Sequence, residues 1–178
     1  PKRMRVHFAD VNSTDPVVFR TRNPAVPVVL CLPAMGVKAS YYETLGGALA
    51  KQGFNTILAD LRGRGGSSVR ATRSVSFGYA EILEQELPAI VESVCLEFGA
   101  ATIVVLGHSL GGQLGLLFAA TSARVSHVVL VASGSAWYRR LPGARSIGRF
   151  LGRPLISAPR LPRGYLPLCP PSPRRRGG

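Results

Sequence analysis

The pentapeptide Gly107-His108-Ser109-Leu110-Gly111 is the segment of this sequence best suited to covalent chemistry. It has the form G-x-S-x-G, with an apolar run at 101–106 before it and a helix-like run after it. In that setting the motif predicts a tight strand-to-helix turn that exposes a serine hydroxyl above a sheet. Gly107 and Gly111 lack a Cβ, so a strand and a helix can approach each other closely there. We therefore expect Ser109 to be a nucleophile in acyl transfer, which requires a base and an acid from elsewhere in the chain.

The surrounding sequence alternates apolar runs with helical patterns. This alternation predicts an α/β fold with a mostly parallel sheet and helices on both of its faces, because the strands are nearly continuous Val, Ile and Leu. Pro88 lies inside the second predicted helix and predicts a kink there, or two helices joined at that point. Strands are predicted at 17–20, with 4–8 as its partner, and at 26–32, 55–59, 102–106 and 128–131, and helices at 41–52, 79–98 and 109–120.

Two further motifs follow predicted strands. Leu32-Pro33-Ala34-Met35-Gly36 closes the strand at 26–32, and Asp60-Leu61-Arg62-Gly63-Arg64-Gly65-Gly66-Ser67 follows the strand at 55–59. Together with the pentapeptide, these motifs resemble the α/β-hydrolase fold family over about residues 17–140. The D-x-R-G-x-G-x-S and G-H-S-x-G patterns resemble its serine aminopeptidase-like and monoglyceride-lipase-like branch in particular. The resemblance implies a serine hydrolase of esters, lipid esters or peptide-like amides, with an α/β-hydrolase core at 1–137.

The resemblance also assigns an oxyanion hole. In the family, two backbone N–H groups stabilise the developing oxyanion. One belongs to the residue after the nucleophile, which is Leu110 here, and the other to the loop after an earlier strand, which points to Met35. The family often has His-Gly where this chain has Pro33-Ala34. Leu110 also lies at a helix N-terminus, where the helix dipole favours negative charge.

The remaining motif residues are interpreted as structural. In the glycine-rich loop that contains Gly63 and Gly65, the side chains of Asp60 and Arg62 are expected to cap turns and to connect neighbouring strands. His108 is expected to be a packing or hydrogen-bonding element of the turn.

The acid and the base that Ser109 needs are not identified in the sequence. The family places them after the nucleophile, in the order Ser, Asp or Glu, His. The last acidic residue is Glu97, and the only later histidine is His127, which is expected just before the strand at 128–131 as a surface residue. Loss of the base lowers turnover by a factor on the order of 10⁶ in such a triad. The sequence therefore predicts a hydrolase with weak or no activity or, alternatively, a non-catalytic remnant or binding module with a basic tail.

Composition divides the chain near residue 137. Residues 1–137 carry a net charge of +3, whereas 138–178 carry ten arginines, no acid and 8 of the 14 prolines. We predict that 138–156 begin a cap region and that 157–178 are disordered. Truncation, a reading-frame error or a divergent tail would each account for the change in composition. The arginines could bind phosphate backbones or an anionic membrane surface, but few aromatic residues accompany them, so nucleic acid is not favoured as a partner.

Other features narrow the class of function. No apolar run reaches the roughly 18 residues of a membrane span, and no secretory signal is recognised. Three cysteines lie far apart and are expected to be buried thiols, so a cytoplasmic location is predicted. The glycine-rich loop lacks the Lys-Ser/Thr pair of a P-loop, so no cofactor is expected, and no metal site is predicted. The expected partner is a small-molecule ester or amide. The strand at 128–131 is expected to be an exposed apolar edge that favours aggregation, and the oligomeric state is not specified.

Overall fold

The computed structural model describes residues 1–8, 12–21 and 26–134. All of these except Thr72–Ser76 form one compact unit, and the fold and the candidate site belong to it. Thr72–Ser76 form a local turn in which Thr72 N donates to Val75 O over 3.0 Å. The elements, in chain order, are β1 (Lys2–Arg3), β2 (Val6–Phe8), β3 (Asn12–Thr14), β4 (Val17–Phe19), β5 (Val28–Leu32), η1 (Ala39–Tyr42), α1 (Glu43–Lys51), β6 (Asn55–Leu58), α2 (Tyr79–Glu81), η2 (Ile82–Glu86), α3 (Leu87–Phe98), β7 (Ile103–His108), α4 (Leu110–Ala119) and β8 (Val125–Val131).

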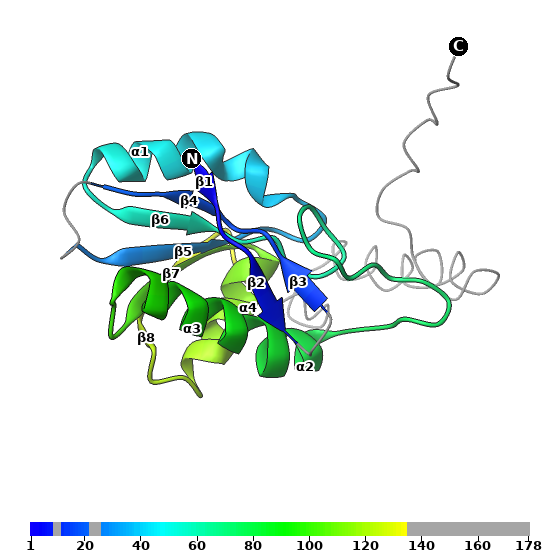
Figure 1. The fold of residues 1–178 in the computed structure, drawn as a ribbon. Coiled ribbons are helices and arrows are strands. Elements are labelled where there is room, and N and C mark those ends of the chain that lie inside the picture. The colour runs from blue at the N-terminus through cyan, green and yellow to red at the C-terminus, as the bar shows by residue number, and fades with distance from the viewer. Residues whose placement is uncertain (9–11, 22–25, 135–178) are drawn as a thin grey trace, which may run out of the picture. The chain divides into compact units, whose positions relative to one another are not determined.

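Six strands form one sheet in the order β1-β4-β6-β5-β7-β8. The four strands from β6 to β8 in that order pair in parallel, whereas β4 is antiparallel to β6 and to β1. The predicted α/β class with a mostly parallel sheet is confirmed. Because parallel strands end at the same edge, the loops after β5, β6 and β7 gather along that edge (Figure 1). All three predicted motifs lie in these loops.

Helices cover both faces of the sheet, with α1 on one face and α3 and α4 on the other (Figure 1). Side chains alternate along β5, so that Leu30 belongs to the core under α3 and α4, whereas Cys31 belongs to the smaller core under α1. The larger core also contains Ile57, Ile90 and Leu114, which are completely buried. These two cores hold the strand ends rigidly, which is what a site built on loops needs.

The helical region from Tyr79 to Phe98 is continuous, and its irregular turn lies at 82–86, just before Pro88, so the two separate helices considered from the sequence are not found. The chain runs from α2 through one π-helical turn, η2, into α3, and Pro88 stands in the first turn of α3. Proline has no N–H to donate to the preceding turn, and a wider π turn accommodates that loss. Glu86, the last residue of η2, is buried.

Two expectations about strands were wrong. The segment at 4–8 does not pair with 17–20, because Val6 pairs with Thr14 in the separate β2–β3 hairpin and only Lys2–Arg3 pairs with β4. The burial of Val6 in the larger core favours this arrangement. In addition, β8 begins at Val125 rather than at 128, so His127 lies inside the strand. On an edge strand, polar side chains remain in solvent, so the apolar run underestimates the length of the strand.

The regions expected to hold a cap at 138–156 and a disordered tail at 157–178 lie outside the described residues. Among the helices that the described residues form, none is both long enough and apolar enough to cross a membrane.

Candidate active site

Ser109 stands alone between a strand and a helix, in a conformation that few side chains adopt. β7 ends at His108, α4 begins at Leu110, and Ser109 between them has φ 51° and ψ −111°. A positive φ is unfavourable for a residue with a Cβ, so the surrounding structure must impose it. Ser109 is partly exposed, and among the described residues its hydroxyl has no hydrogen-bond partner. The geometry is that of a sharp turn which presents a serine hydroxyl.

The glycines around Ser109 are required by close backbone approach. A Cβ on Gly107 would lie 2.4 Å from the Cα of Gly112, and one on Gly111 would lie 2.3 Å from the carbonyl oxygen of Leu32. Both distances are far below van der Waals contact, so no larger residue fits without backbone movement. The contact at Gly111 also shows that the first turn of α4 packs directly against the end of β5.

Backbone hydrogen bonds fix the turn and leave one N–H available. Ser109 N donates to Val131 O over 2.9 Å, which ties the turn to the end of β8. Its carbonyl accepts from Gly112 N and Gln113 N, as in the first turn of a helix. Among the described residues the N–H of Leu110 has no acceptor, and it stands at the N-terminus of α4, where such groups attract negative charge.

Met35 lies in a tight turn after β5, and we call residues 33–37 the β5 loop. Val37 N donates to Ala34 O over 3.1 Å, and Gly36 has φ 79°. Within the part of the chain that the structure describes, the Met35 N–H has no acceptor, and its side chain is 66% exposed. Since Leu32 pairs with Gly107, the β5 loop and the serine turn begin at neighbouring strand ends. The structure thus brings Met35 and Leu110 to the same region of the sheet edge.

Tyr42 links these two loops, and sequence reasoning did not anticipate it. Its Oη lies 2.7 Å from His108 Nδ1 and accepts a hydrogen bond from Ala34 N over 3.1 Å. The Tyr42 hydroxyl keeps its own proton, which it can donate to Nδ1. The only sequence signal for Tyr42 was its place in the helix predicted at 41–52, which indicates no role in a site.

Asp60 organises the loop after β6, and we call residues 60–70 the Asp60 loop. One carboxylate oxygen accepts from Ala39 N over 2.7 Å and the other accepts from Gly66 N over 2.9 Å. A Cβ on Gly65 would lie 1.9 Å from this carboxylate, and Gly65 has φ 46°. Each oxygen of the Asp60 carboxylate therefore accepts a backbone N–H, and the residue is buried.

Arg62 anchors the Asp60 loop to η2 through Glu86, a residue that sequence reasoning also missed. Arg62 Nε donates to Glu86 Oε2 over 3.0 Å, and the Arg62 N–H donates to the same oxygen over 3.1 Å. Both side chains are almost completely buried, and Oε1 of Glu86 has no hydrogen-bond partner among the described residues. Burial raises the pKa of Glu86 above the ordinary glutamate value, and the opposing effect of Arg62 is smaller.

No histidine of the described residues stands beside the Ser109 hydroxyl as a base. His127 is exposed and pairs with Val104, four positions along the β7–β8 ladder from His108, which is roughly 13 Å at strand spacing. His7 is exposed in the β2–β3 hairpin. Cys31 is no alternative nucleophile, because burial raises its pKa to about 12 and leaves it a thiol at neutral pH.

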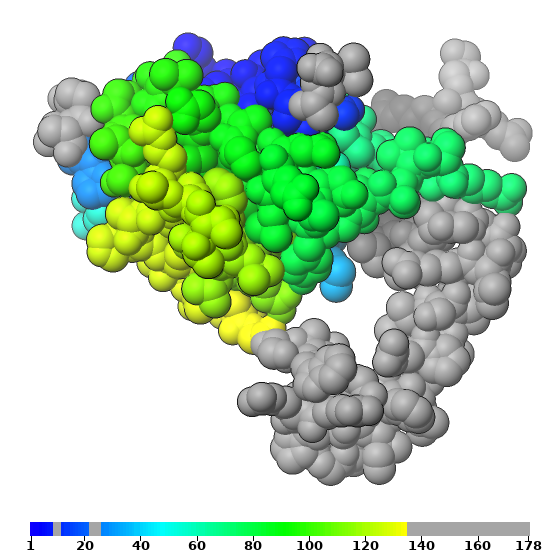
Figure 2. Space-filling view, turned by 90° about the horizontal axis from the view of Figure 1, so that it is seen from below, coloured from blue at the N-terminus to red at the C-terminus, as the bar shows by residue number. Residues whose placement is uncertain are grey.

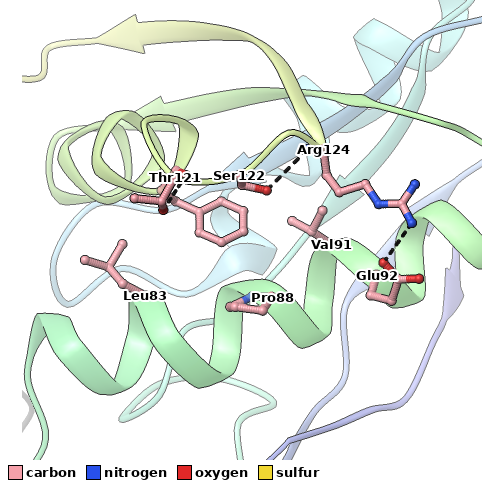
Figure 3. A pocket seen from close by; sticks show the side chains of 8 residues that line it. Leu83, Pro88, Val91, Glu92, Thr121, Ser122 and Arg124 are labelled. Carbon is pink, nitrogen blue, oxygen red and sulfur yellow. Dashed lines mark hydrogen bonds and ion pairs between the residues drawn. The ribbon is translucent and has the colours of Figure 1, made fainter.

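A surface cavity of about 480 Å³ lies away from Ser109. Its lining includes the apolar side chains of Val91 and Phe118, and Arg124 and Glu92 form an ion pair of 3.3 Å. Figure 3 shows that Val91 and Glu92 come from α3 and that Arg124 comes from the segment after α4. Ser109 stands at the opposite end of α4 from Phe118, about 15 Å away along the helix axis. This cavity therefore has no part in the arrangement around Ser109. No three metal-ligating side chains converge within the described parts of the chain.

A comparison with models of protein families identifies the family of this chain. The model of the alpha/beta hydrolase fold matches residues 27–176. The chain belongs to the α/β-hydrolase fold family. The mostly parallel sheet with helices on both faces agrees with this family. The expected family is confirmed, whereas the branch within it stays a prediction. A comparison with curated proteins found no match.

Solved structures agree with this fold. An esterase from Exiguobacterium antarcticum superimposes with a TM-score of 0.60 at 17% identity, over 74% of this chain and 46% of the esterase. An epoxide hydrolase from Vigna radiata gives a TM-score of 0.61 at 18% identity, over 72% of this chain and 37% of the hydrolase. A thioesterase domain from the curacin biosynthetic pathway gives a TM-score of 0.61 at 23% identity, over 88% of this chain and 53% of the thioesterase domain. The chain therefore spans about half or less of the length of these α/β-hydrolases.

Proposed function

We propose that this chain carries the nucleophilic half of a serine hydrolase that acts on carboxylic esters, lipid esters or peptide-like amides. The observation that supports the proposal best is the conformation of Ser109, whose positive φ at a strand-to-helix turn has no structural use that a glycine would not serve better. Two α/β-hydrolases of similar fold are named as an esterase and a thioesterase, and both names describe cleavage of an acyl group.

In the proposed reaction, the Ser109 Oγ attacks the carbonyl carbon and forms a new C–O bond. The N–H groups of Leu110 and Met35 stabilise the negative charge on the carbonyl oxygen. The bond to the leaving alcohol then breaks, and that alcohol takes up the proton lost by Ser109. Water releases the acyl group from Ser109 in a second step and restores the hydroxyl. His108, held by Tyr42, fixes the start of the turn, whereas Asp60 and Arg62 stabilise the neighbouring loop.

The proposed activity of this chain alone is weak. Among the described residues no imidazole contacts Ser109, and the sequence has no acidic residue after Glu97. Without a base and its acid, the remaining oxyanion hole and binding groups typically give 10³- to 10⁴-fold acceleration over water, as an order of magnitude. The alternative function is that of a non-catalytic remnant or binding module that keeps the fold and has lost the chemistry.

The test is acylation of Ser109 itself. The whole chain is incubated with a fluorophosphonate probe and with p-nitrophenyl butyrate, and adducts are located by mass spectrometry. We expect slow modification of Ser109, none at that peptide in Ser109→Ala, and steady turnover that Ser109→Ala changes little. Ser122→Ala, three residues after the end of α4, is the matched control. Absence of any adduct at Ser109 would support the non-catalytic alternative.

Added imidazole provides a second readout, because a small diffusible base can replace a missing histidine. We expect imidazole to raise ester turnover more in the unmodified chain than in Ser109→Ala, whose rate measures the direct attack of imidazole on the ester. Turnover already as fast as typical hydrolases without imidazole, at about 10 s⁻¹, would show that a base acts from a part of the chain outside the described residues.

A further inference from the structure

Arg64 is held in a fixed position beside the β5 loop. Its N–H donates to Leu61 O over 3.2 Å, and its carbonyl accepts from Ser67 N over 3.0 Å, so the Asp60 loop makes two successive turns around it. The flanking glycines have φ 87° at Gly63 and 46° at Gly65, conformations that turn the chain sharply on both sides. The backbone of Arg64 is therefore well defined, although it lies in a loop.

The guanidinium of Arg64 reaches the loop that carries Met35. A Cβ built on Gly36 would lie 3.6 Å from Nη2 of Arg64, which is ordinary contact distance. Gly36 directly follows Met35, whose N–H is one of the two proposed oxyanion donors. The positive charge of Arg64 thus lies next to the loop proposed to bind the carbonyl oxygen of a substrate.

The guanidinium of Arg64 makes no hydrogen bond or ion pair with the described residues. Arg64 is partly buried, and among the described residues no carboxylate, carbonyl oxygen or aromatic ring accepts its donors. The other arginines of the Asp60 loop behave differently. Arg62 donates to the Glu86 carboxylate and to the carbonyl of Glu81. Arg70 donates to the carbonyls of Gly65, Ser67 and Val69.

Asp60, the acidic residue of the same loop, forms no hydrogen bond or ion pair with Arg64. Both oxygens of Asp60 already accept from the backbone, at Ala39 and at Gly66. A guanidinium carries five N–H donors in a planar fork that matches a carboxylate or phosphate group, and such bidentate pairs are strong. A partly buried arginine without a partner, next to a proposed oxyanion donor, is suited to binding an anionic group of a ligand.

We propose that Arg64 binds an anionic oxyacid group, a carboxylate or a phosphate, on the acyl side of the substrate. The inference rests on the proposed function, because it places the anionic group relative to a carbonyl carbon attacked by Ser109. It narrows the substrate class to acyl compounds that carry a second, negatively charged end, such as half-esters of dicarboxylic acids. The acyl side follows from the position of the guanidinium at Gly36, beside the donor to the acyl oxygen.

The test compares acylation of Ser109 by neutral and anionic esters of the same leaving group. The p-nitrophenyl half-esters of succinic, glutaric and adipic acids are compared with p-nitrophenyl butyrate, and a 4-phosphonobutyrate ester distinguishes phosphate from carboxylate recognition. We expect at least one anionic ester to acylate Ser109 about tenfold faster than butyrate, the size of one charge-assisted pair. The variants are Arg64→Gln and Arg64→Lys, with Lys51→Gln as control.

Arg64→Gln should abolish the preference by slowing acylation by the anionic ester about tenfold more than acylation by butyrate, whereas Arg64→Lys should keep part of the preference, because the charge remains and the fork is lost. Lys51→Gln removes the same charge from an exposed site on α1 and should keep the full preference. The inference is overturned if no anionic ester is preferred, or if the preference survives in Arg64→Gln.

A direct binding measurement separates this inference from the proposed function. The ¹H–¹⁵N signal of Arg64 Nε–H is followed while glutarate or inorganic phosphate is added to the whole chain. A saturable shift that is absent for the backbone signal of Lys51 supports an anion site even if Ser109 proves unreactive, in which case only the proposed function fails. No shift with either anion would overturn the role of Arg64 even if butyrate acylates Ser109.

Discussion

Tyr42 is the side chain through which the serine turn and the β5 loop depend on each other. Tyr42→Phe removes both the bond to His108 Nδ1 and the acceptor of the Ala34 N–H, so we expect a loss of about 1–2 kcal/mol in unfolding free energy. The loop that carries Met35 also loses a fixed point, and acylation of Ser109 should slow several-fold. Urea unfolding and the mass-spectrometric assay measure the two effects. Tyr41→Phe is the control, because Tyr41 is 77% exposed and its hydroxyl makes no hydrogen bond among the described residues.

Glu86 makes the free energy of unfolding depend on pH, and the sign of this dependence follows from the burial of its side chain. Burial raises its pKa in the folded protein, so between the ordinary glutamate pKa and this raised pKa the folded state holds a proton that the unfolded state has released. The corresponding stability is complete below the ordinary pKa and is lost as pH rises through the raised value. Glu86→Gln cannot titrate and should lack this loss.

The measurement for Glu86 is the unfolding free energy of the two proteins from pH 4 to pH 8. We expect the unfolding free energy of the wild type to fall relative to that of Glu86→Gln as pH rises. Asp15 and Glu81 have pKa values lowered by Arg5 and by the backbone of Gly78, so they act in the opposite direction at acidic pH, but they are common to both proteins and cancel. A difference that stays constant across the range would contradict a raised pKa at Glu86.

At the scale of single elements, α4 depends on how closely it approaches the strands. Gly111→Ala places a methyl group 2.3 Å from the carbonyl oxygen of Leu32, and backbone on both sides must move. We expect a loss of about 2 kcal/mol or more in unfolding free energy, together with loss of Ser109 labelling. Gly47→Ala in α1 is the matched control, because its new Cβ has its nearest neighbour, the Phe19 ring, at 3.9 Å. It should stabilise by about 0.5–1 kcal/mol through helix propensity.

The sequence predicts a feature well where the residues that form it are neighbours in sequence. It predicts a feature poorly where a residue acquires its role from contact with a distant segment. The G-x-S-x-G spacing predicted the turn at Ser109, because the glycines it requires are neighbours in sequence. Glu86, Tyr42 and Arg64 were not predicted as parts of the site, because each acquires its role from a contact with a distant segment. A glutamate in a helical stripe indicates a solvated surface until the fold places Arg62 against it.

At the scale of the whole molecule, the sheet ends in an apolar strand with nothing paired along its outer side among the described residues. Within β8, Val129, Leu130 and Val131 are each 43–47% exposed, and the yellow segment around β8 lies at the surface in Figure 2. Such an edge offers unpaired backbone groups to another strand. We therefore expect the protein to associate as its concentration rises, as the exposed edge predicted from the sequence would favour.

A charge on this edge should suppress association without weakening the fold. Leu130→Lys places an ammonium group on an exposed position of β8, where the free energy gained by burial is small, so unfolding free energy should change by less than about 1 kcal/mol. Leu96→Lys is the control, because it introduces the same charge away from the edge. Leu96 lies on α3 and is 74% exposed. Sedimentation velocity over a hundredfold range of concentration should show a smaller species for Leu130→Lys and unchanged association for Leu96→Lys. Equal suppression by both variants would mean that net charge, rather than the β8 edge, controls association, since a strand-pairing contact responds to the edge alone.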